Sequence, residues 1–175
     1  MVKRSAVNLG EIKLLVLDVD GVLTDGAVII NSDGGESKFF SAVDGHGIRM
    51  WQRAGMKVAF LSGRLSEPTK YRAEQLEIDY CLQNRLDKLA ALKELIGQVG
   101  LSAKNIAYIG DDLPDLPPIR YVGFGVAVAN AMDEVKQSAD YVTTRPGGSG
   151  AVREVIEYIL KNTDKWQQLM KRYLP

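Results

Sequence analysis

The stretch Leu14-Leu-Val-Leu-Asp-Val-Asp-Gly-Val-Leu-Thr-Asp25 decides how the rest of the sequence is interpreted. Its first four residues form a short apolar run, which is typical of a strand buried on both faces of a parallel sheet. The run ends at Asp18, and a second aspartate, Asp20, directly precedes Gly21. Two carboxylates and a turn therefore follow a predicted strand, at the edge where open α/β sheets bind their ligands.

Apolar segments alternate with segments of helical period along the rest of the chain, and this alternation favours an α/β fold with a parallel sheet covered by helices. The predicted strands are 14–17, 57–61, 79–82, 105–109, 124–128 and 141–144. The predicted helices are 47–54, 68–76, 85–99, 116–122, 133–138 and 151–160.

One insertion interrupts the alternation directly after the first strand. Residues 27–30 and 37–40 flank Asn31-Ser-Asp-Gly-Gly35, a pattern typical of a β-hairpin with an Asp-Gly turn. The apolar side chains of a lone hairpin would be costly to expose, so burial against a partner is expected.

The chain of 175 residues shows no linker and no internal repeat, so we predict a single domain over 1–175. Its core runs from about 12 to 160, and the hairpin insert occupies about 26–41. Residues 163–175 form a C-terminal arm, either a frayed helix or a segment that packs on a neighbouring subunit.

Composition excludes several classes of protein. Lys plus Arg equals Asp plus Glu, 22 against 22, which gives no reason to expect binding to nucleic acid or to an anionic membrane. The longest uncharged stretch, 121–132, is too short to span a bilayer, and no apolar run follows the first charges as in a secretory signal. With a single cysteine there is no internal disulfide, and we predict a cytoplasmic protein.

Polar side chains follow the other long strands as well. Ser62 and Arg64 follow the strand over 57–61, Asp111 follows the strand over 105–109, and Lys88 lies near the start of a predicted helix. Since the carboxyl ends of parallel strands meet at one edge, we expect these groups to share a crevice with the first two aspartates.

The gathered carboxylates would repel one another, and a divalent cation such as Mg²⁺ would relieve that repulsion. Ser62 and Lys88 would add a hydroxyl donor and a positive charge beside the cation. Carboxylate, Mg²⁺, hydroxyl and ammonium are together the groups that phosphoryl transfer through an aspartyl phosphate needs. Each short motif alone is more often a simple turn, and only their common position at strand ends favours a site.

These residues resemble the motifs of the haloacid dehalogenase superfamily of phosphatases. The resemblance narrows to its 3-deoxy-D-manno-octulosonate 8-phosphate phosphatase family and extends from about Ile12 to Leu160. It implies a Rossmann-like three-layer haloacid dehalogenase fold with a parallel sheet, a small β-hairpin insert and no large cap domain. The segments that carry it are 18–25, Leu61-Ser-Gly-Arg64, Lys88, Ile109-Gly-Asp-Asp112, the hairpin, Asp44-Gly-His-Gly-Ile48 and 147–154.

The resemblance implies roles for individual residues. Asp18 would be the nucleophile and a metal ligand, and Asp111 the second carboxylate on Mg²⁺. Asp20 would protonate the leaving sugar oxygen and then deprotonate the hydrolytic water, while its backbone carbonyl binds the metal. Ser62 and Lys88 would hold the phosphoryl oxygens.

The resemblance also implies substrate contacts and an assembly. The expected substrate-binding residues are Asp20, Ser41, Asp44, Gly45, Arg49, Arg64, Arg72 and Lys88. Arginines suit a sugar acid that carries both a carboxylate and a phosphate. The hairpin would build a homotetramer in which a neighbour closes each active site.

Three alternatives remain open at the level of sequence. The family pattern often has a basic residue where this chain has Val43. A nine-carbon sialic-acid-type 9-phosphate is therefore a second candidate substrate. A non-catalytic tetrameric module could keep the same fold, although this chain keeps both Asp18 and Asp20. The segment Gly147-Gly-Ser-Gly150 could cradle an anion or simply turn into a helix.

Overall fold

The computed structural model describes residues 7–174. Its main sheet is parallel throughout, with the strand order β5-β4-β1-β6-β7-β8. The prediction of an α/β fold with a parallel sheet is confirmed. The direction in which successive strands are added to the sheet reverses between β1 and β6, as in Rossmann-like sheets. The strands are β1 (Leu14–Leu17), β4 (Lys57–Leu61), β5 (Tyr80–Leu82), β6 (Ile106–Gly110), β7 (Phe124–Ala127) and β8 (Tyr141–Val142).

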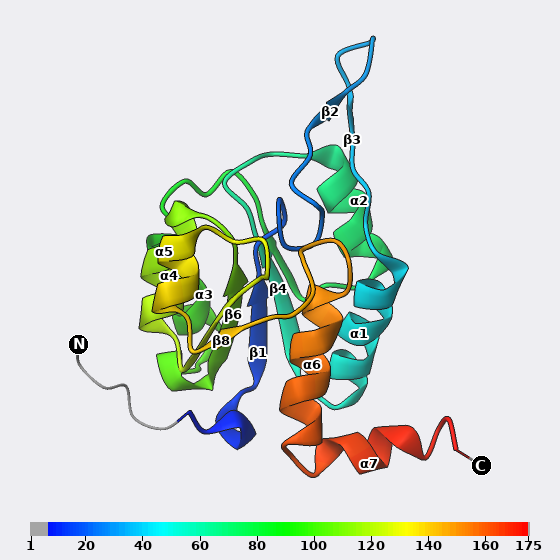
Figure 1. The fold of residues 1–175 in the computed structure, drawn as a ribbon, viewed down its shortest axis with the longest axis vertical. Helices are drawn as coiled ribbons and strands as arrows, with labels where there is room; N and C mark the ends of the chain where they lie inside the picture. The colour runs from blue at the N-terminus through cyan, green and yellow to red at the C-terminus, as the bar shows by residue number, and fades with distance from the viewer. Residues whose placement is uncertain (1–6, 175) are drawn as a thin grey trace.

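Helices cover both faces of the sheet and give three layers (Figure 1). α1 and α6 pack on one face, and α3, α4 and α5 lie on the other. The helices are α1 (Ala42–Arg53), α2 (Glu67–Gln75), α3 (Lys88–Val99), α4 (Leu116–Tyr121), α5 (Asp133–Ser138), α6 (Ala151–Lys161) and α7 (Lys165–Met170). Short 3₁₀ turns occupy η1 (Leu9–Glu11), η2 (Ala103–Asn105) and η3 (Leu113–Asp115). Within residues 7–174, no helix has the length and apolar character that crossing a membrane requires.

The core lies between these layers. Every residue of β1, β6 and β7 is buried, which explains why these strands are continuous apolar runs rather than alternating ones. The largest fully buried side chains include Trp51 of α1, Phe60 of β4 and Tyr108 of β6. The Trp51 indole N–H donates to the Lys57 carbonyl at 2.8 Å, so this large side chain also fixes α1 against β4.

Helix α1 begins five residues before the predicted start at 47. The Ser41 hydroxyl accepts from the Asp44 amide at 3.2 Å and caps the helix there. Gly45 and Gly47 both lie inside the helix. A Cβ on Gly47 would lie 2.9 Å from the Arg153 side chain and 3.2 Å from its Cα. That glycine is needed for the close approach of α1 and α6.

The hairpin insert is present and projects beyond the carboxyl ends of the sheet strands (Figure 1). β2 (Ile29–Ile30) and β3 (Glu36–Ser37) pair antiparallel. The Asn31 amide donates to the Gly35 carbonyl at 2.8 Å, and Gly34 has a φ of 82°, which favours glycine. The prediction of a hairpin is confirmed, with shorter strands than expected.

The C-terminal segment forms α7 and then returns to α1 of its own chain. Arg53 donates to the Tyr173 hydroxyl at 3.0 Å, and that hydroxyl lies 3.1 Å from His46 Nε2. These contacts join the segment to its own chain. Its packing on a neighbouring subunit stays a prediction.

Candidate active site

A cavity of about 340 Å³ opens beyond the carboxyl ends of β1, β4 and β6. It therefore lies beside the point where the strand order reverses, which is the usual ligand site of such sheets. Segments far apart in sequence meet there, as the motif positions predicted. Its lining residues are Asp18, Asp20, Gly26, Ser62, Gly63, Arg64, Leu86, Lys88, Asp111, Asp112 and Pro114.

Lys88 is the buried cation at the base of this cavity. Asp87 caps α3 by accepting from the Ala90 amide at 2.9 Å, which places Lys88 in the first turn of the helix. Its ammonium group lies 2.8 Å from Asp18 Oδ1 and 2.7 Å from Asp115 Oδ1. Burial opposes the charge, but the two carboxylates outweigh that effect and raise the pKa of Lys88. The side chain is therefore held as an ammonium ion.

Asp115 supports the site and was missed by the sequence analysis. Its carboxylate is fully buried and accepts from the Tyr108 hydroxyl at 2.6 Å, from Lys88, and from the amides of Asp111 and Asp112 at 3.1 and 3.3 Å. It thus orders both the cation and the loop after β6. The available signal was a further carboxylate four residues after Asp111, beyond Pro114, where a tight turn returns the chain to the strand end.

Asp18, Asp111 and Asp115 bring three carboxylates to the single ammonium group of Lys88, so this cluster keeps an excess of negative charge. Burial, together with the charge of Asp115, raises the pKa of Asp18 well above its usual value. Burial and Asp115 also raise the pKa of Asp111 to about 6. One carboxylate oxygen from each of these three residues lies within 4.8 Å of the others. Such crowding is unfavourable without a cation.

The free carboxylate oxygens at the cavity fit a divalent cation such as Mg²⁺. Asp111 Oδ1 is buried and has no hydrogen-bond partner among residues 7–174. Both oxygens of Asp115 already accept hydrogen bonds, so Asp18 and Asp111 are the carboxylates left for the metal. Gly21 makes room for them, because a Cβ there would lie 2.0 Å from Asp111 Oδ2. Few carboxylates and space for water are what Mg²⁺ requires.

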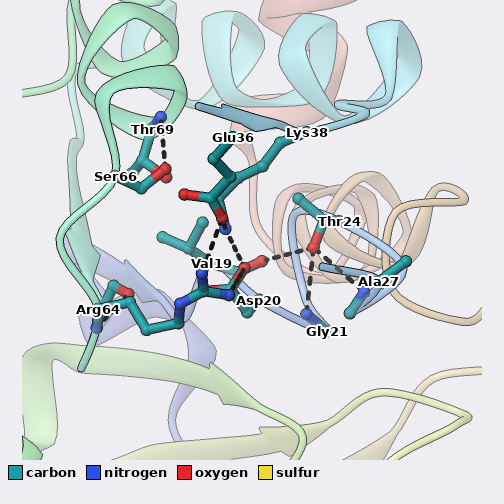
Figure 2. A network of polar contacts seen from close by, with 12 residues as sticks. Val19, Asp20, Gly21, Thr24, Ala27, Glu36, Lys38, Arg64, Ser66 and Thr69 are labelled. Carbon is teal, nitrogen blue, oxygen red and sulfur yellow. Dashed lines mark hydrogen bonds and ion pairs between the residues drawn. The ribbon is translucent and has the colours of Figure 1, made fainter. Parts of the chain in front are cut away.

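Ser62 and Asp20 lie on the cavity wall next to these groups. Ser62 is buried at the end of β4, and its hydroxyl accepts from the Arg64 amide at 3.1 Å. The Asp20 carboxylate contacts the ammonium group of Lys38, and its Oδ1 lies 4.0 Å from Arg64 Nη1 (Figure 2). Lys38 comes from the hairpin and was also missed by the sequence analysis.

Asp44, a predicted substrate contact, has its carboxylate engaged within the protein. It is buried, and its two oxygens accept from the amides of Gly150 and Arg153 at 3.0 and 2.8 Å. These are the N-cap and an early residue of α6, so the carboxylate caps that helix from α1.

The arginines of α1 and α2 also have partners away from the cavity. Arg49 donates to the Leu76 carbonyl at 3.0 Å, and Arg72 donates to the Ser41 carbonyl at 3.2 Å. A Cβ on Gly45 would lie 2.3 Å from Arg72 Nη2. None of Ser41, Asp44, Gly45, Arg49 and Arg72 lines the cavity. The predicted substrate contacts that line it are Asp20, Arg64 and Lys88.

The glycine-rich loop before α6 acts as a turn rather than an anion cradle. The amides of Gly147 and Gly148 donate to Asn130 Oδ1 and to the Val22 carbonyl at 2.8 and 2.9 Å. The amide of Gly150 donates to Asp44, as described above. A Cβ on Gly147 would lie 1.7 Å from the Gly21 carbonyl oxygen. The loop therefore packs closely against the turn that follows β1.

A Rossmann-like sheet whose central strand ends in Asp-x-Asp, with a second acidic loop and a buried lysine at the same edge, defines a haloacid dehalogenase-like hydrolase. The family described as haloacid dehalogenase-like hydrolase matches residues 81–156. The 3-deoxy-D-manno-octulosonate 8-phosphate phosphatase of Escherichia coli K12 is 42% identical over 149 residues, which cover 85% of this chain and 79% of that protein.

Solved structures agree with this similarity. The octulosonate 8-phosphate phosphatase of Moraxella catarrhalis, in complex with magnesium, phosphate and the sugar acid, has a TM-score of 0.92 and 42% identity, covering 94% of this chain and 95% of that one. The cobalt-bound enzyme from Haemophilus influenzae has a TM-score of 0.85 and 42% identity, covering 87% and 90%. The chain belongs to the 3-deoxy-D-manno-octulosonate 8-phosphate phosphatase family.

Proposed function

We propose that this protein is a Mg²⁺-dependent phosphatase that hydrolyses 3-deoxy-D-manno-octulosonate 8-phosphate to the free sugar acid and phosphate. The observation that carries the proposal is the arrangement of Asp18, Asp111 and Lys88 in one cavity. The buried ammonium group of Lys88 contacts Asp18, and Asp111 keeps a buried oxygen that has no hydrogen-bond partner within the described residues 7–174. The similarity to octulosonate 8-phosphate phosphatases supports the choice of substrate. Neither the nine-carbon substrate nor the non-catalytic module is needed to explain these features.

In the proposed reaction Asp18 attacks the phosphorus atom and forms an aspartyl phosphate, and the bond to the sugar oxygen breaks. Asp20 gives its proton to that leaving oxygen. It then takes a proton from the water that attacks the aspartyl phosphate, which releases phosphate and restores Asp18. Asp18, Asp111 and the Asp20 carbonyl would hold Mg²⁺, which would supply positive charge for the phosphoryl oxygens.

The remaining site residues bind and orient the substrate. Lys88 and Ser62 donate to the phosphoryl oxygens and stabilise the charge that develops on them. Arg64 lies on the cavity wall, where its guanidinium group can bind an anionic part of the sugar acid. The assignment of Ser41, Asp44, Gly45, Arg49 and Arg72 as substrate contacts stays a prediction.

The proposal extends to a homotetramer built through the hairpin, in the cytoplasm, with no nucleic-acid or membrane partner. The support for the tetramer is the exposure of large apolar side chains on the hairpin. Val28, Ile30 and Phe39 are 53%, 67% and 74% exposed in the single chain. Side chains of this kind rarely remain in water unless a partner covers them.

The test is Asp18→Asn, which keeps the shape of the side chain and removes its nucleophilic charge. Mg²⁺-dependent phosphate release from the octulosonate 8-phosphate should fall by about a thousandfold or more, because loss of a nucleophile removes the covalent step. Asp133→Asn, on an exposed residue of α5, is the matched control and should leave activity unchanged. Undiminished release from the Asp18 variant would refute the mechanism.

Comparing kcat/KM for the octulosonate 8-phosphate and a nine-carbon sialic-acid-type 9-phosphate would test the choice of substrate.

A further inference from the structure

Lys38, on the strand that leaves the hairpin, is a buried cation beside the cavity. Its side chain is only 1% exposed, although the hairpin itself projects into solvent. The ammonium group contacts Asp20 Oδ1 and lies 3.2 Å from Glu36 Oε1 (Figure 2). A lysine at the foot of a hairpin normally extends its charge into water. This one is directed inward onto Asp20.

Glu36 joins Lys38 to a third segment of the chain. The same Oε1 atom of Glu36 accepts from Arg64 Nη2 at 3.0 Å, and Arg64 Nη1 lies 4.0 Å from Asp20 Oδ1. The four side chains therefore form a closed ring of alternating charge (Figure 2). The ring connects the loop after β1, the hairpin and the loop after β4.

The cost of burying Lys38 indicates what the ring does. A buried ammonium group is tolerated only when carboxylates surround it, and here Asp20 and Glu36 do so. Removing one member of such a network leaves the others with unpaired charge, so the arrangement resists displacement. Both cations approach Oδ1 of Asp20, which leaves Oδ2 as the oxygen that can face a substrate.

We propose that Lys38 is a positioning residue for catalysis. Lys38 donates to Oδ1 of Asp20 both when Asp20 is ionised and when it is protonated, so Oδ2 is the oxygen that carries the transferred proton. Oδ2 is thereby aimed at the oxygen to which the proton passes, and Glu36 holds Lys38 in place. The inference rests on the proposed function, in which Asp20 transfers that proton. It gives the hairpin a direct part in the chemistry, separate from any part in assembly.

The test replaces Lys38 by Met, which keeps the length of the side chain and removes its charge. A misaligned proton donor should lower kcat on the octulosonate 8-phosphate by about 10- to 100-fold, with KM changed less than about threefold. Lys38→Arg restores a cation and should recover part of the loss. Lys104→Met, on a 70% exposed lysine in η2 at the other end of the sheet, is the matched control and should behave as wild type.

A second substrate separates positioning from general damage. The p-nitrophenolate ion leaves without needing a proton, so the first turnover, which phosphorylates Asp18 and releases this ion, does not need Asp20 as donor. Hydrolysis of the aspartyl phosphate needs Asp20 as base with either substrate, so the first turnover is measured separately, as the burst of p-nitrophenolate and as the single-turnover release of the sugar acid. Lys38→Met should lower the burst rate by less than about fivefold. Equal losses in the two single-turnover rates, a rise in KM with kcat unchanged, or full kcat on the sugar-acid phosphate would each overturn the inference.

Glu36→Gln keeps the test decisive if Lys38→Met does not fold. It leaves Lys38 in place without its second carboxylate. A smaller loss is expected, greater in the single-turnover release of the sugar acid than in the p-nitrophenolate burst. Full kcat in that variant would overturn the inference. If neither wild type nor Lys104→Met releases phosphate from the sugar-acid phosphate, the proposed function fails and this inference fails with it. If both do and Lys38→Met matches them, only this inference fails.

Discussion

At the scale of single residues, the proposed metal ligand Asp111 lowers the stability of the metal-free fold. Its pKa in the folded protein is about 6, because burial and Asp115 disfavour its charge, whereas the ordinary value is 3.8. The metal-free folded state therefore binds this proton more tightly than the unfolded chain does. Relative to higher pH, this tighter proton binding stabilises the folded state. The stabilisation is fully present below pH 3.8 and is lost as the pH rises through about 6.

Asp111→Asn should remove that penalty. We expect the metal-free variant to have a Tm at least about 2 °C above wild type at pH 8, with the difference disappearing near pH 4. Mg²⁺ should raise the Tm of wild type and have little effect on the variant, because a ligand is lost. Thermal melts with and without Mg²⁺ at the two pH values measure both effects.

Asp133→Asn replaces an exposed carboxylate on α5 and is the control for that experiment. It should change neither the Tm of the metal-free protein nor the rise in Tm caused by Mg²⁺. A lower Tm for metal-free Asp111→Asn at pH 8 would contradict the account of an uncompensated charge. So would an equal Mg²⁺-dependent rise in both proteins.

Three of the cavity residues that were predicted from the sequence share one property. Asp18, Ser62 and Asp111 directly follow apolar strands, and the parallel sheet brings such positions to one edge. Asp115 and Lys38 lack that property. Asp115 reaches the site through a 3₁₀ turn, and Lys38 through the way the hairpin folds back. Both depend on tertiary geometry that strand periodicity does not contain.

At the scale of elements, α6 depends on a side chain from another helix. Its N-cap, Gly150, has a φ of 101° and no side chain with which to cap the amides that follow. Asp44 of α1 supplies the acceptor for the amides of Gly150 and Arg153. The docking of α1 on α6 and the start of α6 are thus stabilised by one carboxylate.

Asp44→Ala should therefore destabilise the fold by about 1–3 kcal/mol, since two buried amides lose their acceptor. Asp44→Asn keeps one oxygen acceptor and should cost less. Urea denaturation of both variants measures the difference. If capping is the only role of Asp44, the folded Asn variant keeps the wild-type KM. A several-fold rise in KM with unchanged stability would instead favour the predicted substrate contact.

The ends of the elements show why their placement by sequence was uneven. Helices α5 and α6 begin and end within one residue of their predicted bounds. The start of α1 was predicted five residues too late, because two glycines, Gly45 and Gly47, are unfavourable inside a helix. Their small size serves packing against Arg72 and Arg153 instead, and a packing requirement of this kind is set by a distant segment.

At the scale of the whole molecule, the hairpin connects the proposed assembly to the proposed chemistry. Its side chains Ile30 and Phe39 are largely exposed, whereas the side chain of Lys38 is buried and contacts Asp20. A subunit packed on the exposed side chains would restrain the hairpin, and with it the ring of charge around Asp20. Assembly and proton transfer should then be coupled.

The double substitution Ile30→Glu and Phe39→Glu tests that coupling, because burying two carboxylates in an apolar interface is strongly unfavourable. Light scattering should give four times 19.2 kDa for wild type and 19.2 kDa for the variant. Tyr121→Glu, on an exposed tyrosine of α4, is the control and should remain tetrameric. The monomer should lose kcat on the octulosonate 8-phosphate, since a less restrained hairpin holds Asp20 less firmly. A wild-type mass of 19.2 kDa would contradict the tetramer, and a monomeric variant with undiminished kcat would show that the hairpin needs no neighbour to hold Asp20.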